Sequence, residues 1–409
     1  MKFLQVDSLE QARNKLLQAA GDNFRKTENT DIMEAAGRTL AEDIICPEMI
    51  PDFRRSTVDG YAVCAKDTQG AGESIPVFLK IVEDVAIGRP ALHKIKSGEC
   101  AYVPTGGMIP DGADAMVMVE YTELFDEENV AIYCSVSQGS SVVQIGEDAK
   151  KDSVLLEKGT ILNAASVGVL ASLGRTSVKV FCPWKLTVIS TGDELTAPGT
   201  VKEPCRIYDV NTYAVCALAR EQGLEIVETH VLPDDEKALE EALHRGICSS
   251  DIVAVSGGSS QGKKDMTAQM IDKIAVPGVW THGLALKPGK PTIVGMDEPS
   301  GTLLVGLPGH PVAALMVFRL LILWLKETIQ GEMRGRSLPA VMESNVPSAP
   351  GKATCQMVKL IKGEEGYIAR PVFGKSGLMS TLTQADGYVM LEINQEGLKS
   401  GEQVYVELL

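Results

Sequence analysis

The chain has 409 residues, of which 44% are hydrophobic and 23% are charged, values typical of a globular protein with several domains. Its net charge of −15 and its 5% of aromatic residues argue against a nucleic-acid surface, an anionic membrane surface and a base-stacking platform. Nine cysteines without a C-x-x-C pair argue against the usual zinc and redox motifs and favour reduced thiols in a cytoplasmic protein.

The first part of the chain predicts a helical domain with a β-rich module inserted into it. Residues 8–42 have apolar residues at helical spacing, and a helical pattern returns at 163–173, where Asn163 is the expected N-cap. Between these stretches, short β-branched runs alternate with Gly and Pro. We therefore assign residues 1–45 and 147–183 to the helical domain and residues 46–146 to the module. The strands expected in the module are 75–82, 99–103, 115–121 and 129–136.

Strands and helices alternate in the next part, residues 184–330, which predicts parallel βα units. The expected strands are 185–190, 251–256, 292–294 and 302–307, and the expected helices are 212–222, 234–247, 265–274 and 311–329. The apolar part of the last helix is too short for a membrane span and predicts a buried helix. Short strands separated by Gly, Pro and Asn predict a closing β-domain at 331–409.

Glycine-rich loops follow three of the predicted strands. They are S-T-G-D-E-L (190–195), S-G-G-S-S-Q-G-K-K-D (256–265) and G-L-P-G-H-P (306–311). The carboxyl ends of parallel strands share one edge of a sheet, where ligands bind, and glycine lets backbone N–H groups approach an anion closely. The loops therefore predict a cleft for a small anionic ligand that carries phosphate.

At these loops the sequence resembles the molybdopterin molybdenumtransferase family of the MoeA type, shared with the C-terminal part of gephyrin. The likeness covers essentially the whole chain. Besides the three loops, it rests on S-T-V-D-G-Y-A-V (56–63), P-T-G-G-M-I-P-D-G-A-D-A (104–115), I-Y-D-V-N (207–211), K-P-G-K-P (287–291) and G-K-S-G-L-M-S (374–380).

The resemblance implies a multidomain α/β fold, with a MogA-like α/β sheet domain, an inserted β-rich module, a helical N-terminal domain and a C-terminal β-domain. It implies insertion of molybdate into adenylylated molybdopterin with release of AMP, in molybdenum cofactor biosynthesis. It also implies a homodimer whose active site is shared between the α/β domain of one subunit and the β module of the other. Molybdopterin adenylyltransferase and molybdoenzyme maturation proteins are possible partners. The alternative is a non-catalytic carrier of the cofactor or its precursor with the same fold.

The resemblance places Asp59 and Thr105 of the β module at the shared cleft. Taken alone, the Asp59-Gly60 dipeptide favours a hairpin turn, and Thr105 is a loop residue beside Pro104. With Glu194 and Lys287, they make up the predicted catalytic set.

Carboxylates beside a phosphate loop would repel the ligand unless Mg²⁺ bridges them. The predicted metal ligands are Glu194, Asp234, Asp235 and Asp265, and the alternative for the aspartates that begin helices is N-capping. Lys287 and Lys290 flank a Pro-Gly turn and are expected to attract the anion, or else to be solvated turn residues.

The remaining predicted ligand-binding residues lie in or near the loops. They are Thr191, Gly192, Asp209, Asn211, Ser256, Gly257, Gly258, Lys290, Pro308, Gly309, His310 and Ser376. For Asn211, capping of the following helix is the alternative. None of the five histidines has a convincing catalytic partner in the sequence, so we expect electrostatic positioning rather than covalent catalysis.

The sequence departs from the family pattern in two loops. Lys263 and Lys264 precede Asp265 where an acidic residue usually follows the glycine, and His310 stands where asparagine is common. These departures call into question whether the protein requires a metal ion and whether it turns over substrate. They do not change the expected fold.

Overall fold

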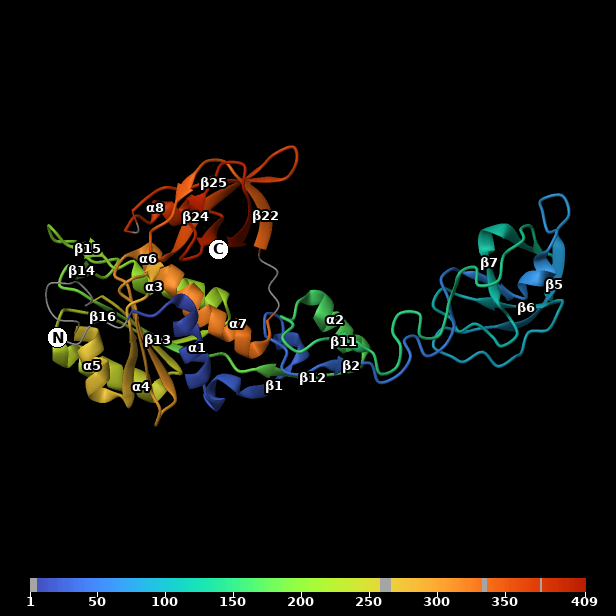
Figure 1. Cartoon of the computed structure of the whole chain (residues 1–409). Coiled ribbons are helices and arrows are strands. Elements are labelled where there is room, and N and C mark those ends of the chain that lie inside the picture. The colour runs from blue at the N-terminus through green and yellow to red at the C-terminus, as the bar shows by residue number, and fades with distance from the viewer. Residues whose placement is uncertain (1–5, 258–265, 333–336, 376) are drawn as a thin grey trace. The chain divides into compact units, whose positions relative to one another are not determined.

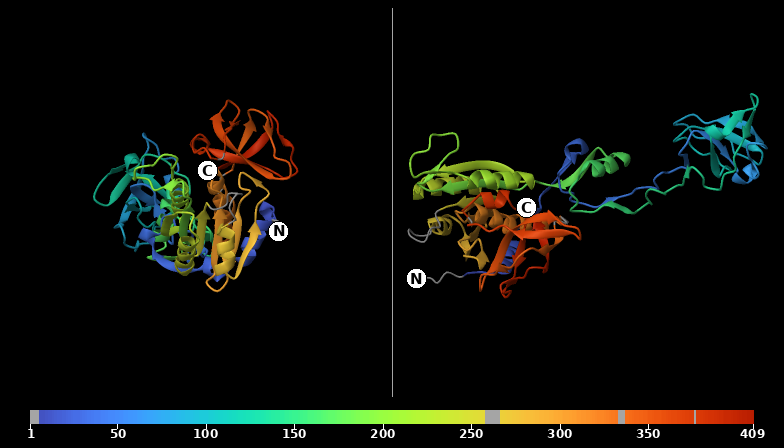
Figure 2. Two further views of the ribbon diagram at one scale, coloured as in Figure 1. Left: turned by 90° about the vertical axis from the view of Figure 1, so that its left-hand side faces the viewer. Right: turned by 90° about the horizontal axis from the view of Figure 1, so that it is seen from above.

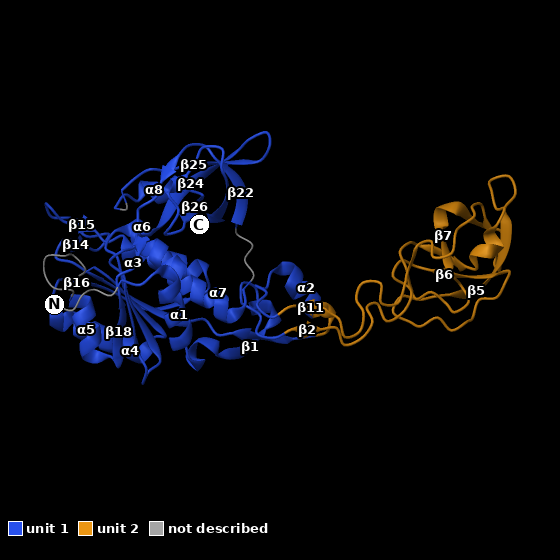
Figure 3. Cartoon of the chain, in the orientation of Figure 1, with its two compact units in different colours: residues 1–42, 158–170, 175–409 blue, residues 43–157, 171–174 orange. Residues whose placement is uncertain are grey.

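The computed structural model describes residues 6–257, 266–332, 337–375 and 377–409 (Figure 1). The described residues divide into two compact units (Figure 3). Unit 1 comprises Met1–Glu42, Lys158–Leu170 and Arg175–Leu409, and unit 2 comprises Asp43–Glu157 and Ala171–Gly174. Most of unit 2 is therefore formed by a segment inserted into the sequence of unit 1, as expected for an inserted module. The finer division of the chain into four domains stays a prediction.

A mixed β-sheet is the centre of the α/β part of unit 1, with strand order β16-β13-β17-β21-β20-β18. Its parallel strands are β16 (Glu225–Leu232), β13 (Lys185–Thr191), β17 (Ile252–Ser256) and β21 (Thr302–Leu307). Strand β20 (Ile293–Asp297) runs antiparallel to β21 and to β18 (Pro277–His282). The expectation of parallel units alone was wrong for β20, because it returns directly from its neighbour β18 without a crossover helix.

The central strands are apolar on both faces because helices cover both (Figure 2). In β17, Ile252 and Ala254 pack in the cluster that includes α1 (Leu9–Ala19) and α3 (Asn211–Glu221). The alternate residues Val253 and Val255 pack with α4 (Glu236–Ser249) and α5 (Met266–Ile274). The period-2 alternation of a strand thus divides one apolar run between two cores.

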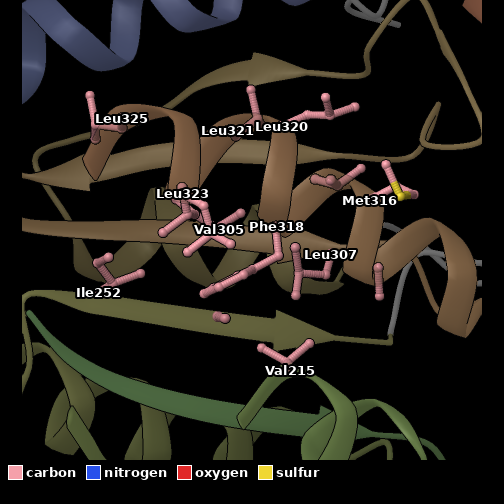
Figure 4. Close-up of a cluster of buried hydrophobic side chains, with 14 of the residues drawn as sticks. Val215, Ile252, Val305, Leu307, Met316, Phe318, Leu320, Leu321, Leu323 and Leu325 are labelled. Atoms are coloured by element: carbon pink, nitrogen blue, oxygen red, sulfur yellow. The ribbon is translucent and has the colours of Figure 1, made fainter. Parts of the chain in front are cut away.

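The apolar stretch after the third loop is a buried helix, as predicted. It consists of α6 (Pro311–Val317), a π-helical turn (Phe318–Leu323) and α7 (Trp324–Gln330), and Pro311 occupies the first turn. Phe318 and Leu321 are fully buried in the core that Figure 4 shows. None of the helices in the described residues is long and apolar enough to cross a membrane.

The C-terminal part of unit 1 is a second sheet, with order β19-β24-β25-β22-β28-β26 and a further β24–β26 pairing that closes it. Its bounds are β19 (Leu286–Lys287), β24 (Ala353–Lys362), β25 (Tyr367–Pro371), β22 (Ser337–Met342), β28 (Gln403–Leu408) and β26 (Gly387–Leu391). Strand β19 comes from the α/β part of the sequence and is parallel to β24. The predicted closing β-domain therefore contains one strand from outside residues 331–409.

The helical expectation for residues 8–42 holds only for its first part. Helix α1 begins after Ser8, whose side chain forms a capping box with Gln11, and ends at Ala19. Strand β1 (Thr27–Asp31) then pairs antiparallel with β12 (Ser177–Phe181). Because β1 is polar and mostly exposed, no apolar alternation in the sequence indicated it. Helix α2 (Ala164–Ser172) begins after Asn163, whose Oδ1 accepts from the Ser166 N–H, as expected for an N-cap.

Unit 2 is built on a sheet with strand order β7-β4-β6-β5-β9-β8. The bounds are β7 (Ala115–Met118), β4 (Gly60–Val63), β6 (Glu99–Val103), β5 (Val77–Asp84), β9 (Asn129–Ile132) and β8 (Thr122–Leu124). Short ladders join β2 (Ile44–Ile45) to β11 (Val154–Leu156) and β3 (Arg55–Ser56) to β10 (Val142–Val143). The prediction of a β-rich module is confirmed.

Candidate functional site

The three glycine-rich loops begin at one edge of the α/β sheet, because β13, β17 and β21 are parallel neighbours. Of the second loop, the structure describes Ser256 and Gly257. Gly257, after β17, has a φ of 113°, and a Cβ there would lie 2.1 Å from the Thr191 carbonyl oxygen. Any side chain at Gly257 would therefore collide with the end of β13. The first two loops approach each other closely only because this position is glycine.

The loops open onto a cavity of about 1860 Å³ in unit 1. One wall comes from the carboxyl edge of the α/β sheet and the other from the C-terminal sheet. The predicted site residues that line it are Thr191, Gly192, Glu194, Asp234, Gly257, Lys287, Lys290, Pro308, Gly309 and His310. Most of the predicted ligand-binding loop residues are thus brought together.

Carboxylates line the α/β side of this cavity. The Glu194 carboxylate lies against Gly192, 2.8 Å from the position that a Cβ would take. The backbone N–H of Asp234 donates to Asp193 Oδ1 at 3.1 Å, which ties the loop after β16 to the loop after β13. Glu236, which was not predicted as a site residue from the sequence, also lines the cavity.

Asp235 has the capping role that was its alternative. Its Oδ1 accepts from the Ala238 N–H at 2.7 Å and caps α4, and Asp235 is not among the described residues that line the cavity. Within the described residues there is no group of three or more His, Cys, Asp or Glu side chains arranged to hold a metal ion. Glu194 and Asp234 remain the described carboxylates from the predicted metal set that face the cavity.

Lysines line the C-terminal side. Strand β19 aligns Lys287 with Thr354 of β24, so the Pro-Gly turn between Lys287 and Lys290 stands beside the C-terminal sheet. Lys352 and Lys375, at the start of β24 and after β25, line the same cavity. Neither lysine was predicted as a site residue from the sequence, because a two-residue strand such as β19 gives no periodic signal that would place them near Lys287.

Cys355 also lines the cavity, but burial raises the pKa of its thiol, so it is not a thiolate at neutral pH. A thiolate nucleophile or metal ligand is therefore not expected there. Lysines, carboxylates and loop N–H groups are the means by which this cavity can bind and orient a charged ligand.

A buried hydrogen-bond network connects the start of the glycine-rich loops to the start of α3. The Asn211 amide nitrogen donates to Ser256 Oγ at 2.6 Å and to the Gly309 carbonyl at 2.8 Å. The alternative that Asn211 caps its helix is wrong, because Val210 is the N-cap and Asn211 is already helical. Asp209 Oδ1 accepts from Ser190 Oγ at 3.1 Å and from the Thr212 N–H at 3.3 Å. Asp209 and Asn211 thus connect the start of α3 to the ends of β13, β17 and β21.

In unit 2, Asp59 and Thr105 contact each other. Asp59 Oδ1 accepts from the Thr105 N–H at 2.7 Å and from its Oγ1 at 3.0 Å, and both residues are exposed. The Asp-Gly hairpin alternative is wrong, because β3 and β4, which flank Asp59, are not partners. Gly60 is required instead by the sheet, since a Cβ there would lie 1.9 Å from the Val117 carbonyl oxygen.

Several predicted residues lie outside the described ranges. They are Gly258, Lys263, Lys264, Asp265 and Ser376. Their assigned roles stay predictions.

A parallel sheet edge with glycine-rich loops, facing a wall of lysines, is characteristic of α/β proteins that bind a nucleotide or an anionic cofactor. Comparisons with known proteins define the class more closely. Residues 7–174 match the MoeA N-terminal region (domain I and II), residues 187–327 a probable molybdopterin binding domain, and residues 339–409 the MoeA C-terminal region (domain IV).

Similar proteins match over nearly the whole chain. A molybdopterin molybdenumtransferase of Haemophilus influenzae is 33% identical, with 98% of each chain covered, and that of Bacillus subtilis is 31% identical, with 94% of this chain and 90% of the relative covered. The crystal structure of a molybdopterin biosynthesis MoeA protein from Pyrococcus horikoshii has a TM-score of 0.81 and 35% identity, with 99% of each chain covered. The chain therefore belongs to the MoeA family of molybdopterin molybdenumtransferases, enzymes of molybdenum cofactor biosynthesis. The resemblance and the multidomain α/β fold class expected from the sequence are confirmed.

Proposed function

We propose that this protein inserts molybdate into adenylylated molybdopterin and releases AMP. The observation that carries the proposal is the division of charge in one cavity. Among the described lining residues, carboxylates stand at the loop edge (Glu194, Asp234, Glu236) and lysines at the opposite wall (Lys287, Lys290, Lys352, Lys375).

Both proposed substrates are polyanions, so bringing them together is electrostatically unfavourable. The chain as a whole has a net charge of −15 and would repel them. Lysines gathered at one wall provide the local positive potential that this reaction needs, and loop N–H groups orient the pyrophosphate. Conversion in this site depends on positioning and charge neutralisation, without a covalent enzyme intermediate.

Mg²⁺ is part of the proposal, with Glu194 and Asp234 as its described protein ligands. Two carboxylates beside a bound phosphate are a donor set that Mg²⁺ accepts, since it usually keeps several waters and takes one or two carboxylates plus phosphate oxygens. When bound, the metal neutralises phosphate charge and polarises the bridging phosphate.

AMP release tests the reaction directly. We expect purified protein incubated with adenylylated molybdopterin, molybdate and Mg²⁺ to release AMP in step with cofactor formation, and to release little when molybdate is omitted. Tight binding of the adenylylated substrate without AMP release would make the protein a carrier and refute the proposal.

We further propose a cytoplasmic homodimer with a shared site, to which one subunit gives Asp59 and Thr105 and the other gives the cavity. Molybdopterin adenylyltransferase would supply the substrate, and a molybdoenzyme maturation protein would take the product. The proposal is supported by the exposed Asp59–Thr105 pair, in which the N–H and the hydroxyl of Thr105 both donate to Asp59 Oδ1.

Mixing inactive variants tests the shared site. Asp59→Ala mixed with Glu194→Ala should recover part of the activity after subunit exchange, because some heterodimers then contain one intact site. The matched control is Asp59→Ala mixed with Thr105→Ala, which should stay inactive because both changes lie in the same half of the site. If the first mixture stays as inactive as the control although subunits exchange, the site is not shared.

A further inference from the structure

Two phenyl rings contact each other at the surface of unit 2, the orange unit of Figure 3. Phe78 lies on β5 and Phe125 directly follows β8, and their ring centres are 5.0 Å apart in an edge-to-face arrangement. The two residues are 51% and 68% exposed. The strand register places Phe78 beside Ala131 of β9, and Ala131 beside Glu123 of β8. We call the surface formed by these four residues the aromatic face.

The aromatic face is a part of the sheet that unit 2 itself leaves uncovered. Leu79 packs in a core cluster on one face of the sheet, so its neighbour Phe78 lies on the other face. On that other face, Val85 and Ile95 pack over β4 and β6, and both belong to the connection between β5 and β6. Phe78 and Phe125 remain exposed beside this covered part. Adjacent apolar rings left at the surface of a unit that has its own core indicate an interaction surface.

The turn between β8 and β9, beside the aromatic face, is acidic. Residues 120–128 contain five acidic residues and no basic one. Asp126 Oδ1 accepts from two N–H groups of the turn, each at 2.8 Å, which fixes the shape of the turn. Glu127 and Glu128 are exposed, and Lys80 Nζ lies 3.4 Å from Glu128 Oε2. One ion pair with a lysine leaves the turn with an excess of negative charge.

Most of the negative charge of the chain belongs to this unit. Residues 43–157 contain 20 Asp and Glu but 9 Lys and Arg, which gives −11 of the net charge of −15. Three of these basic residues, Arg89, Lys94 and Lys96, lie in the connection between β5 and β6 and not in the acidic turn. A second copy of this chain, an anionic membrane or a nucleic acid would be repelled by the acidic turn, whereas a basic partner would be attracted.

We propose that the aromatic face is a docking surface for an extended, Lys- and Arg-rich segment of a partner protein. Lysine and arginine side chains can lie over the exposed rings and at the same time pair with the carboxylates of the acidic turn. Strand β8 ends the strand order of the sheet, so its outer edge can receive main-chain hydrogen bonds from an extended segment. The surface shares no residue with the Asp59–Thr105 pair or with the cavity, so docking is independent of the proposed reaction.

A fluorescence anisotropy titration of the full-length protein tests the docking surface. The probe is a labelled peptide in which Lys and Arg alternate with Val, at fixed ionic strength because exposed charges are screened by salt. We expect saturable binding, weakened about tenfold by Phe125→Ala, which removes one ring of the pair. The matched control is Tyr405→Ala, since this ring is 70% exposed on β28 of unit 1, and it should bind the peptide as the unmodified protein does.

Reversal of charge at two places separates a local site from the effect of net charge. Changing both Glu127 and Glu128 to Lys should weaken peptide binding at least tenfold. The matched control changes both Glu364 and Glu365 to Lys, because this exposed pair lies in a turn of unit 1 and its reversal alters the net charge equally. The control should bind nearly as well as the unmodified protein.

Four results would overturn the docking surface. They are no binding of the basic peptide by the unmodified protein, equal binding of a peptide in which Glu replaces Lys and Arg, equal loss of affinity in the two double variants, and unchanged affinity in Phe125→Ala. Thermal unfolding verifies that each variant is folded. Because the variants with changed turn carboxylates leave both rings in place, they decide the question even if Phe125→Ala is unstable.

Two further measurements distinguish other uses of the same surface. Sedimentation should give the same mass for the unmodified protein and for Phe125→Ala, and a smaller mass for the variant would make the aromatic face an interface between copies of this chain. AMP release by Phe125→Ala should equal that of the unmodified protein, and its loss in a folded variant would assign the face to the reaction site. Peptide binding in a protein that releases no AMP would leave the docking surface and remove the proposed reaction.

Discussion

Removing the Asn211 side-chain amide tests whether its hydrogen bonds fix the positions of the loops. Its nitrogen donates to Ser256 Oγ at 2.6 Å and to the Gly309 carbonyl at 2.8 Å, so Asn211→Ala deletes two hydrogen bonds in a buried position. At about 0.5–1.5 kcal/mol each, the two bonds predict a loss of about 1–3 kcal/mol in the free energy of unfolding. Because Gly309 belongs to the cavity lining, the same change should weaken binding of AMP to the protein.

Asn211→Asp should be more damaging than Asn211→Ala. A carbonyl oxygen only accepts hydrogen bonds, so the atom that faces Gly309 has to be the amide nitrogen. An aspartate would place a charged acceptor against that carbonyl and add repulsion to the loss of the bond.

Urea unfolding followed by tryptophan fluorescence measures both variants. The three tryptophans, Trp184, Trp280 and Trp324, all lie in unit 1, so the signal reports on the unit that contains Asn211. Asn23→Ala is the matched control, since the Asn23 side chain donates to the Ser300 carbonyl at 2.9 Å and Asn23 is not among the described residues that line the cavity. The reasoning is refuted if both Asn211 variants unfold within about 0.5 kcal/mol of the unmodified protein, or if AMP affinity changes as little as in the control.

Two further predictions concern charged side chains. Lys287→Ala should change the free energy of unfolding by no more than about 0.5 kcal/mol but weaken the binding of molybdate and AMP about tenfold, the lower end for loss of a charge-assisted hydrogen bond, because Lys287 is exposed. Calorimetric titration measures these affinities, and the control is Lys362→Ala, on β24 and not among the described residues that line the cavity. Equal affinities in the two variants would make Lys287 a solvated turn residue. In unit 2, burial raises the pKa of Glu83, but the N–H groups of His93 and Leu92, which donate to its carboxylate at 2.8 Å, outweigh burial and lower the pKa overall. A carboxylate whose pKa is lowered on folding stabilises the folded protein at pH values above its unfolded pKa of about 4.3, and this stabilisation is lost as the pH falls through the folded pKa. Glu83→Gln should therefore destabilise β5 at pH 7 and progressively less below pH of about 4. Hydrogen exchange of β5 across this range measures the effect, and a pH-independent difference would contradict it.

The features best predicted from the sequence are those that local pattern determines. Strand β21 was expected at 302–307 and is found at Thr302–Leu307, because a strand covered on both faces reads as an uninterrupted apolar run ending in glycine. The positions of the three loops follow from the same pattern, and most of the predicted ligand-binding residues in them line the cavity. What the pattern does not contain is pairing between distant segments, which is why β1, β19 and the antiparallel direction of β20 were missed.

The same distinction explains which site residues were missed. Lys352 is an ordinary surface residue in the sequence, and only the fold shows that it lines the cavity. Asn211 was predicted to bind the ligand, with capping as the alternative; it is not a cap, because its side chain donates to Gly309, 98 positions away in the chain. Local rules assign a polar residue at a helix start to the helix, and only tertiary structure can reassign it.

Strand β19 has a consequence for how the lysine wall works. A lysine side chain loses about 2 kcal/mol of rotamer entropy when it is fixed, so a wall of lysines on independently moving domains would bind an anion weakly. Main-chain pairing of β19 with β24 instead fixes the backbone at Lys287 opposite Thr354, two residues from Lys352. The two lysines therefore start from backbone positions that are already aligned, and only their side chains have to be ordered by the ligand. The C-terminal sheet cannot move away from the turn between Lys287 and Lys290 without breaking these hydrogen bonds. The arrangement of the lysines therefore depends on the pairing of β19 with β24, which connects the two parts of unit 1.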